Sequence, residues 1–207
     1  MDFDVFESVL KETDNHISKN FEKMRRFWEE GRCYCPRCYD IAPRGYEGLG
    51  CVCEGKYVAI DEVFLENWKK VYTAYRDVAK KVLEAFKRHA RGDWKKNIRL
   101  ESSEGNPYIR GPSIKVMFGP KTLPNLVIVY ADRAPVVGIS LIFHSIRDLD
   151  LFRSFVSELR DVAKASPVRT SVVAEFSRTV LKPAEKVMDE LGFKRAGGIG
   201  YIRFVLE

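Results

Sequence analysis

The five cysteines of this chain all lie between positions 33 and 53, in the segments CYCPRC (33–38) and CVC (51–53). Core cysteines scatter along a chain, whereas thiols gathered this closely are typical of a metal site. In a disulfide framework an odd number would leave one thiol unpaired, and the acidic N-terminus lacks the apolar stretch of a secretory signal. We therefore expect a cytoplasmic, reducing setting and a metal held by sulfur.

Each short cysteine turn can aim two thiolates at one point, because two residues separate Cys35 from Cys38 and one separates Cys51 from Cys53. Four thiolates from two turns predict a zinc knuckle with tetrahedral geometry. Cys33 is either a spare thiol beside the site or a replacement for Cys35. An iron–sulfur cluster uses the same ligands and is the alternative. A site closed by four protein ligands predicts a structural metal, since catalytic zinc needs an open position.

A second group of residues with chemical potential is the run KRHARGDWKKNIR (87–99). Its cations could bind phosphates of a nucleic acid or a cofactor, with Trp94 interposed. The alternative is that basic residues simply complement the dipole at the end of a helix. The candidate phosphate-binding residues are Lys87, Arg88, Arg91, Lys95, Lys96 and Arg99.

The composition sets the outer limits. The 207 residues allow one large domain or two small ones, and an apolar content of 45% supplies a core. No run approaches the roughly 18 apolar residues of a membrane span, so we expect no membrane partner. The chain has no glutamine and many charged residues, which indicates a thermophilic host.

Apolar residues spaced by three and four positions predict amphipathic helices over 3–29 and 61–90, with Gly31 and Gly92 beyond their ends. They would form a helical hairpin joined by the zinc-binding loop. After residue 92 the pattern changes to strands alternating with helices, which predicts a mixed β-sheet flanked by helices. The expected fold is therefore α+β, with a helical zinc-binding domain at 1–92 and an α/β domain at 93–207. The later elements are predicted as strands in SIKVMFG, NLVIVYADRAPVVGISLIFHS (a hairpin), VRTSVVAEF and YIRFVLE, and as helices at 149–165, capped by Asp148, and from Pro183 to Gly192.

The stretches ADRAPVVGISLIF (131–143) and LKPAEKVMDELGF (181–193) place a hairpin strand before one helix and Leu-Gly-Phe at the end of the next. In this respect residues 110–207 resemble the GNAT acyltransferase fold. The resemblance implies acetyl-CoA as a cofactor, admitted where the strand ending at Phe143 splays from the strand starting at Val168. It also implies a glycine-rich pyrophosphate loop, but this chain has HSIRDLDLF (144–152) at that position.

Two further positions depart from the family. Leu181 and Met188 stand where the family has Asn and Tyr, although the intervening alanine is present as Ala184. Another acid–base group is therefore needed, and Glu175 in the strand SVVAEFS is the candidate general base if burial raises its pKa. The alternative is that Glu175 faces solvent on an alternating strand. His144 is interpreted as an edge residue.

Three functions are consistent with these features and are kept as hypotheses. The first is a divergent GNAT-like acyltransferase with a structural zinc site, acting on an unknown acceptor such as a protein. The second is a non-enzymatic, zinc-containing nucleic-acid-binding protein that uses the basic cluster at 87–99 together with the zinc segment as one positive face. The third is binding of a protein partner or a second copy through the aromatic stripes of the first two helices. The oligomeric state is left open.

Overall fold

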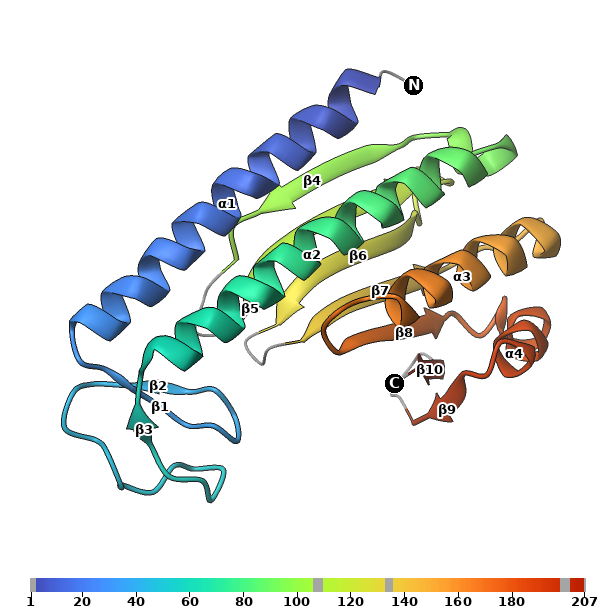
Figure 1. Ribbon diagram of the computed structural model, residues 1–207. Helices are drawn as coiled ribbons and strands as arrows, with labels where there is room; N and C mark the ends of the chain where they lie inside the picture. The colour runs from blue at the N-terminus through green and yellow to red at the C-terminus, as the bar shows by residue number, and fades with distance from the viewer. Residues whose placement is uncertain (1–2, 106–109, 133–135, 198–201, 207) are drawn as a thin grey trace.

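The structure is a computed structural model that describes residues 3–105, 110–132, 136–197 and 202–206. Over these residues it has an α+β fold, in which long helices lie against a large sheet and a small sheet sits at one end (Figure 1). The elements are α1 (Phe3–Glu29), β1 (Cys33–Tyr34), β2 (Ile41–Ala42), β3 (Val58–Ala59), α2 (Glu62–His89), the 3-10 helix η1 (Gly92–Lys95), β4 (Arg99–Ser103), β5 (Arg110–Phe118), β6 (Asn125–Asp132), β7 (Val137–Phe143), α3 (Leu149–Lys164), β8 (Thr170–Phe176), α4 (Leu181–Glu190), β9 (Lys194–Ala196) and β10 (Ile202–Leu206).

Helices α1 and α2 form the predicted hairpin and run in opposite directions, and the segment that connects them carries the small sheet β2-β1-β3 at the end of the hairpin (Figure 1). Helix α1 ends at Glu29 because Gly31 adopts a φ of 66°, a left-handed conformation that favours glycine. Helix α2 begins behind Asp61, whose side chain accepts a hydrogen bond from the N–H of Phe64 at 2.8 Å. The same cap geometry starts α3, where Asp148 accepts from the N–H of Leu151 at 2.8 Å, as expected from the sequence.

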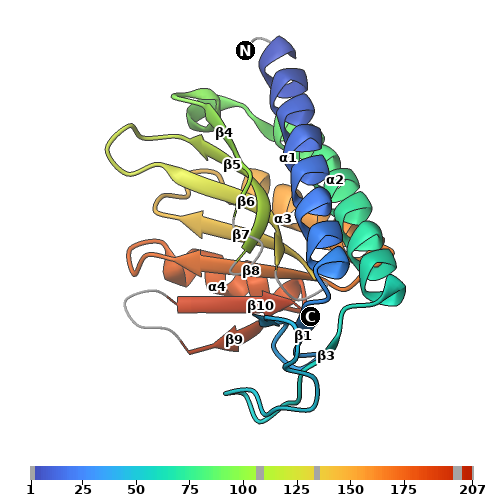
Figure 2. The same ribbon diagram turned by 90° about the vertical axis from the view of Figure 1, so that its left-hand side faces the viewer.

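The large sheet has the strand order β4-β5-β6-β7-β8-β10-β9 (Figure 2). Its pairs are antiparallel except β7 and β8, so the prediction of a mixed sheet is confirmed. Side chains along β6 alternate between buried and half-buried, which is typical of a sheet with one covered face. Helices α1, α2 and α3 lie across that same face, and the core sits between them and the sheet (Figure 1).

The core is continuous across the predicted domain boundary at residue 92. The ring of Phe86 in α2 lies 4.9 Å from that of Phe118 in β5 and 6.4 Å from that of Phe155 in α3, measured between centroids. The boundary itself stays a prediction. These ring contacts mean that the orientation of α2 is set by the sheet as well as by α1.

Some elements were not predicted. The cysteine segment was expected to be loop, but it contains three two-residue strands paired as an antiparallel sheet. Strands β4 and β9 and the helix η1 were also missed, since they are short and carry little periodicity. Helix α4 begins two residues before Pro183 and ends at Glu190. Residues 133–135 of the hairpin turn and residues 198–201 before the last strand lie outside the described residues.

Within the part of the chain that the structure describes, no helix combines the length and the apolar character needed to span a bilayer.

Candidate functional site

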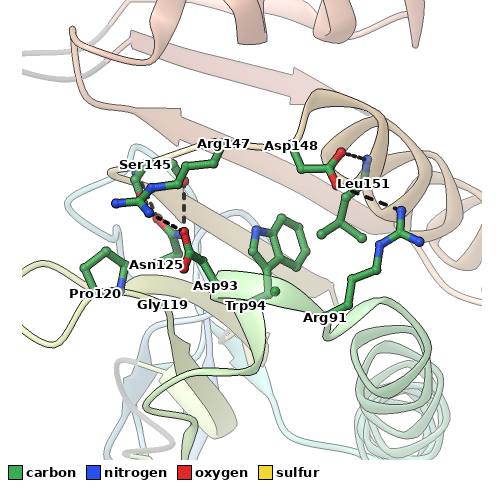
Figure 3. Close-up of a pocket in the computed structure, with 11 residues that line it drawn as sticks. Arg91, Asp93, Trp94, Gly119, Pro120, Asn125, Ser145, Arg147, Asp148 and Leu151 are labelled. Carbon is green, nitrogen blue, oxygen red and sulfur yellow. Dashed lines mark hydrogen bonds and ion pairs between the residues drawn. The ribbon is translucent and has the colours of Figure 1, made fainter.

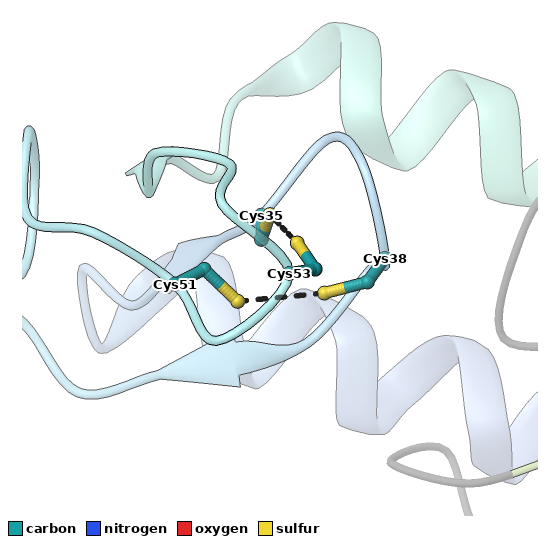
Figure 4. Close-up of side chains that lie close together, drawn as sticks. All are labelled: Cys35, Cys38, Cys51 and Cys53. Atoms are coloured by element: carbon teal, nitrogen blue, oxygen red, sulfur yellow. Dashed lines mark hydrogen bonds between the residues drawn. The ribbon is translucent and has the colours of Figure 1, made fainter.

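Four of the five cysteines converge on one point beside the small sheet (Figure 4). The sulfur atoms of Cys35, Cys38, Cys51 and Cys53 all lie within 4.8 Å of one another. The Sγ atoms of Cys35 and Cys53 are 3.4 Å apart, and those of Cys38 and Cys51 are 3.5 Å apart. Because a metal–sulfur bond of about 2.3 Å places the corners of a tetrahedron about 3.8 Å apart, these spacings fit four ligands around a single ion.

The two cysteine turns share one backbone pattern. In the first, the N–H of Cys35 donates to the carbonyl of Asp40 at 2.9 Å, and in the second, the N–H of Cys51 donates to the carbonyl of Gly55 at 2.8 Å. Each turn closes through a residue at positive φ, Tyr39 at 59° and Glu54 at 65°. Backbone N–H groups are thereby directed at three of the sulfurs, in the pairs Asp40 to Cys38, Cys53 to Cys51 and Gly55 to Cys53.

Three of the four cluster cysteines have a shifted pKa, and the shifts differ in direction. The hydrogen bond from the N–H of Cys53 is the largest cause that lowers the pKa of Cys51, to about 6, which favours the thiolate form of this sulfur at neutral pH. Burial raises the pKa of Cys38 to about 12, and burial also raises the pKa of Cys53. A divalent ion would supply the charge that deprotonates the remaining thiols.

Cys33 does not belong to the cluster. It is fully buried in β1, where it pairs with Ala42 of β2 and Ala59 of β3. Its sulfur faces the turn around Tyr46 and Glu47, and burial raises the pKa of this thiol. Of the two assignments left open by the sequence, the geometry therefore favours Cys35 as the ligand and Cys33 as a core residue.

The donor set fits a metal such as zinc. Four sulfur ligands in tetrahedral spacing are the usual structural zinc site, and a separation of 4.8 Å or less leaves room for one ion rather than for several irons bridged by sulfide. Its role would be to hold the two turns together, because all four positions around the ion are taken by the protein.

The predicted phosphate-binding residues lie at the opposite end of α2 and differ in their surroundings. Arg88 is paired with Glu158 of α3, and Lys96 donates to Asp93 at 2.6 Å. The ammonium of Lys87 lies 4.4 Å above the centre of the Phe6 ring. The exposed cations of this group are Arg88, Arg91, Lys95, Lys96 and Arg99.

Trp94 does not present its ring to solvent as a nucleic-acid platform would. Its side chain is 4% exposed, and its ring lies 5.0 Å from that of Phe118 and 5.2 Å from that of Phe155. The indole instead anchors the short helix η1 in the core. As a result, the neighbouring Lys95 and Lys96 project outward.

The cysteine cluster and the basic run do not make one positive face, contrary to the expectation from the sequence. They lie at opposite ends of α2, which has 28 residues and is therefore about 42 Å long (Figure 1). The sequence could not reveal this separation, because it depends on the helix remaining straight and packed along its whole length.

Glu175 lies on β8 with its side chain 26% exposed, and its carboxylate pairs with Arg203 of β10 at 3.0 Å. This is the solvent-facing alternative that the alternating strand allowed. A partnered carboxylate at the surface lacks the apolar surroundings that would equip it as a general base.

The seam where the GNAT family admits its cofactor is closed in this chain. Seven consecutive residue pairs join β7 to β8, from Val137 with Thr170 to Phe143 with Phe176, without a shift in register. The ladder continues beyond the last pair, where the N–H of Ser177 donates to the carbonyl of Phe143 at 3.1 Å. The two strands therefore do not splay.

A cavity of about 260 Å³ lies next to the basic run, just beyond the C-terminal end of α2 (Figure 3). It is bounded by η1, by the end of β5 and by the loop between β7 and α3. Arg147 of that loop pairs with Asp93 of η1 at 2.7 Å, so it lies beside the cations of the basic run at 87–99. Sequence reasoning missed Arg147, because it is 48 positions or more from the basic run and has no local pattern of its own.

Asn125 positions the loop that carries Arg147. The side chain is 1% exposed; its Oδ1 accepts from the N–H groups of His144 at 2.9 Å and Ser145 at 3.1 Å, and its Nδ2 donates to the carbonyl of Ser145 at 3.1 Å. The sequence did offer a signal for this role of Asn125, because it is a polar residue at an inward position of the strand NLVIVY, and buried polar groups need hydrogen-bond partners.

Comparison with models of protein families, with curated proteins and with solved structures found no match to this chain. The site must therefore be interpreted from its own geometry.

The first prediction concerns metal content. We expect the unaltered protein to contain one zinc ion per chain and Cys38→Ser to contain close to none, because serine is a poor ligand for zinc. Cys33→Ser is the matched control: it removes a buried thiol of the same segment that lies outside the cluster, so the metal content should remain at one. Elemental analysis of both purified variants checks this. Equal loss of metal in the two variants would contradict the ligand assignment.

The second prediction concerns Gly55. A Cβ at this position would lie 2.6 Å from the sulfur of Cys35 and 3.3 Å from that of Cys53, closer than atoms approach without displacement. Gly55→Ala should therefore weaken zinc binding by about 10- to 100-fold, as changes beside metal ligands commonly do. Competition with a chelator measures this. Gly50→Ala, where an added Cβ meets no atom within 4 Å, should bind as the unaltered protein does.

Proposed function

We propose that this protein is a non-enzymatic nucleic-acid-binding protein. It would hold phosphates at the C-terminal end of α2 and a structural zinc ion at the N-terminal end. The observation that carries the proposal is the gathering of cations from two distant segments around η1. The basic end is defined as Arg88, Arg91, Lys95, Lys96, Arg99 and Arg147.

Positive charges at the basic end outnumber the negative charges that pair with them. Six cations stand there, and among the described residues three carboxylates pair with them, those of Asp93, Asp148 and Glu158. Lys96 and Arg147 lower the pKa of Asp93, which keeps this acid charged and holds both cations in place. An excess of exposed cations on a rigid surface is the electrostatic signature of phosphate binding.

The buried position of Trp94 indicates the kind of recognition. With the indole in the core, the surface at η1 offers Lys and Arg side chains and no exposed ring on which a base could stack, among the residues that the structure describes there. Contacts to phosphates fix a protein on a nucleic acid without reading its sequence. We therefore expect binding that depends on charge and varies little with base composition.

Zinc has a supporting role in this proposal. A metal bound by Cys35, Cys38, Cys51 and Cys53 would order the segment between α1 and α2, which has little core of its own. Tyr34 of this segment packs against Phe64 at the start of α2, with ring centroids 4.5 Å apart. The zinc segment thereby stabilises the hairpin that carries the basic end.

Acyl transfer is the second candidate. Its support is the element order of the GNAT resemblance, with a hairpin (β6 and β7), a helix (α3), a strand (β8) and a last helix ending before Gly192-Phe193. The closed pairing of β7 with β8 opposes it, since the family admits acetyl-CoA where these strands separate.

The third prediction is a loss of nucleic-acid binding on charge reversal. The double variant Lys95→Glu with Arg99→Glu should weaken binding to single-stranded DNA by at least about tenfold. It should also reduce the slope of log affinity against log salt, by about 0.7 for each phosphate that is no longer neutralised. Fluorescence anisotropy with strands of different sequence measures both effects.

The control reverses two exposed lysines on α4, with Lys182→Glu and Lys186→Glu. It makes the same change in net charge away from the basic end, so affinity should fall much less. Binding that is absent at low salt, or equal losses in the two double variants, would refute a site at the basic end.

The fourth prediction separates the two candidates. Acetyl-CoA at saturating concentration should shift the thermal midpoint no more than adenosine 3′,5′-bisphosphate does, because this nucleotide carries the same 3′-phosphate and the paired strands β7 and β8 leave no opening for the acyl arm. A ligand at about one hundred times its Kd would add about 2.7 kcal/mol of stability. A shift with acetyl-CoA clearly beyond that of the nucleotide would restore acyl transfer as the better proposal.

A further inference from the structure

The cavity at the basic end is small, so it can admit one small group rather than the body of a strand. Its volume is about 260 Å³, close to the lower limit of about 300 Å³ for small-molecule pockets. Leu151 and Pro120 supply apolar lining, and Arg91 and Arg147 stand on its two sides with the buried Trp94 between them (Figure 3). Asp93 and Asp148 also line the cavity, so an anion can bind there only if an arginine turns toward it from its carboxylate.

The two arginines differ in how firmly they are held. Arg147 lies 2.7 Å from Asp93, so its guanidinium is fixed at one side of the cavity. Arg91 lies 4.0 Å from Asp148, which is beyond hydrogen-bonding distance. Asp148 is already engaged by the N–H of Leu151 at 2.8 Å. Arg91, with 69% of its side chain exposed, can therefore turn to an incoming anion without leaving a buried carboxylate unpaired.

The position of the cavity explains why it would accept the end of a strand. It lies among the exposed cations of the basic end, so a nucleic acid held by Lys95 and Arg99 passes close to it. The body of a strand is too large to enter. A terminal nucleotide can enter, and a phosphate on that nucleotide carries more negative charge than an internal one.

We propose that this cavity binds the phosphorylated end of a nucleic-acid strand. In this arrangement Arg91 contacts the terminal phosphate, Arg147 faces it from the opposite side, and the terminal nucleoside lies against Leu151 and Pro120. Asp93 is a positioning residue that aligns Arg147. The inference rests on the proposed nucleic-acid function and adds the part of the ligand that is recognised.

The experiment compares single strands of one sequence, about 12 nucleotides long, within the usual footprint of a single-strand site. The ends are hydroxyl only, 5′-phosphate or 3′-phosphate, and anisotropy is measured with the full-length, zinc-loaded protein at one salt concentration. One phosphorylated end should bind at least about tenfold more tightly than the hydroxyl form, which is the scale of one charge-assisted hydrogen bond. The end that shows the preference identifies the polarity.

Two variants test the residues. Arg91→Ala should abolish the preference for the phosphorylated end while retaining weaker binding of all three strands, and Arg91→Lys should restore part of it. Lys121→Ala removes the same charge from the loop after β5 without altering the cavity lining, so the preference should persist. Thermal melts confirm that each variant is folded.

The outcomes separate this inference from the proposed function. Salt-dependent binding of all three strands with equal affinity would overturn end recognition and leave nucleic-acid binding in place. No binding of any strand at low salt would overturn both. A preference that survives Arg91→Ala would place end recognition elsewhere and would refute the cavity as its site.

Discussion

The packing of α2 against the sheet is the interaction that holds the remaining structure in place. Twelve of its 28 residues are buried, from Phe64 to Phe86, and they contact α1, α3 and the strands. Burying apolar area on this scale stabilises the helix far more than its intrinsic propensity does. Because α2 is anchored over its full length, the cysteine cluster at its start and the basic end at its finish are held far apart.

This separation gives the two sites independent roles. The four sulfurs close a shell around one point, so a metal there has no position for substrate and acts through the chain that it orders. The basic end is ordered differently, by Trp94 in the core and by Asn125 beneath the loop of Arg147. Loss of metal should therefore disturb the hairpin first and the basic end only through it.

In the C-terminal half the order of the elements could be predicted from the sequence, whereas the geometry that acyl transfer requires could not. The hairpin, α3, β8 and α4 follow one another as the motifs in 131–193 imply, and apolar alternation is sufficient to predict them. Acyl transfer depends in addition on an opening between two strands. In this chain seven residue pairs close that opening, and Glu175 is engaged by Arg203 at the surface. Neither feature can be recognised in a short motif.

Residue spacing along the chain was enough to predict the long helices, the strands of the hairpin, the cap at Asp148 and the thiols that could share a metal. These features depend on contacts within a few residues. The packing of distant segments was needed to show that Cys33 lies outside the cysteine cluster and that Trp94 is buried. It was also needed to show that Arg147 belongs to the basic end and that β7 and β8 pair without an opening. Contacts between segments far apart in the chain leave no periodic trace in the sequence, so these features could be recognised only in the folded molecule.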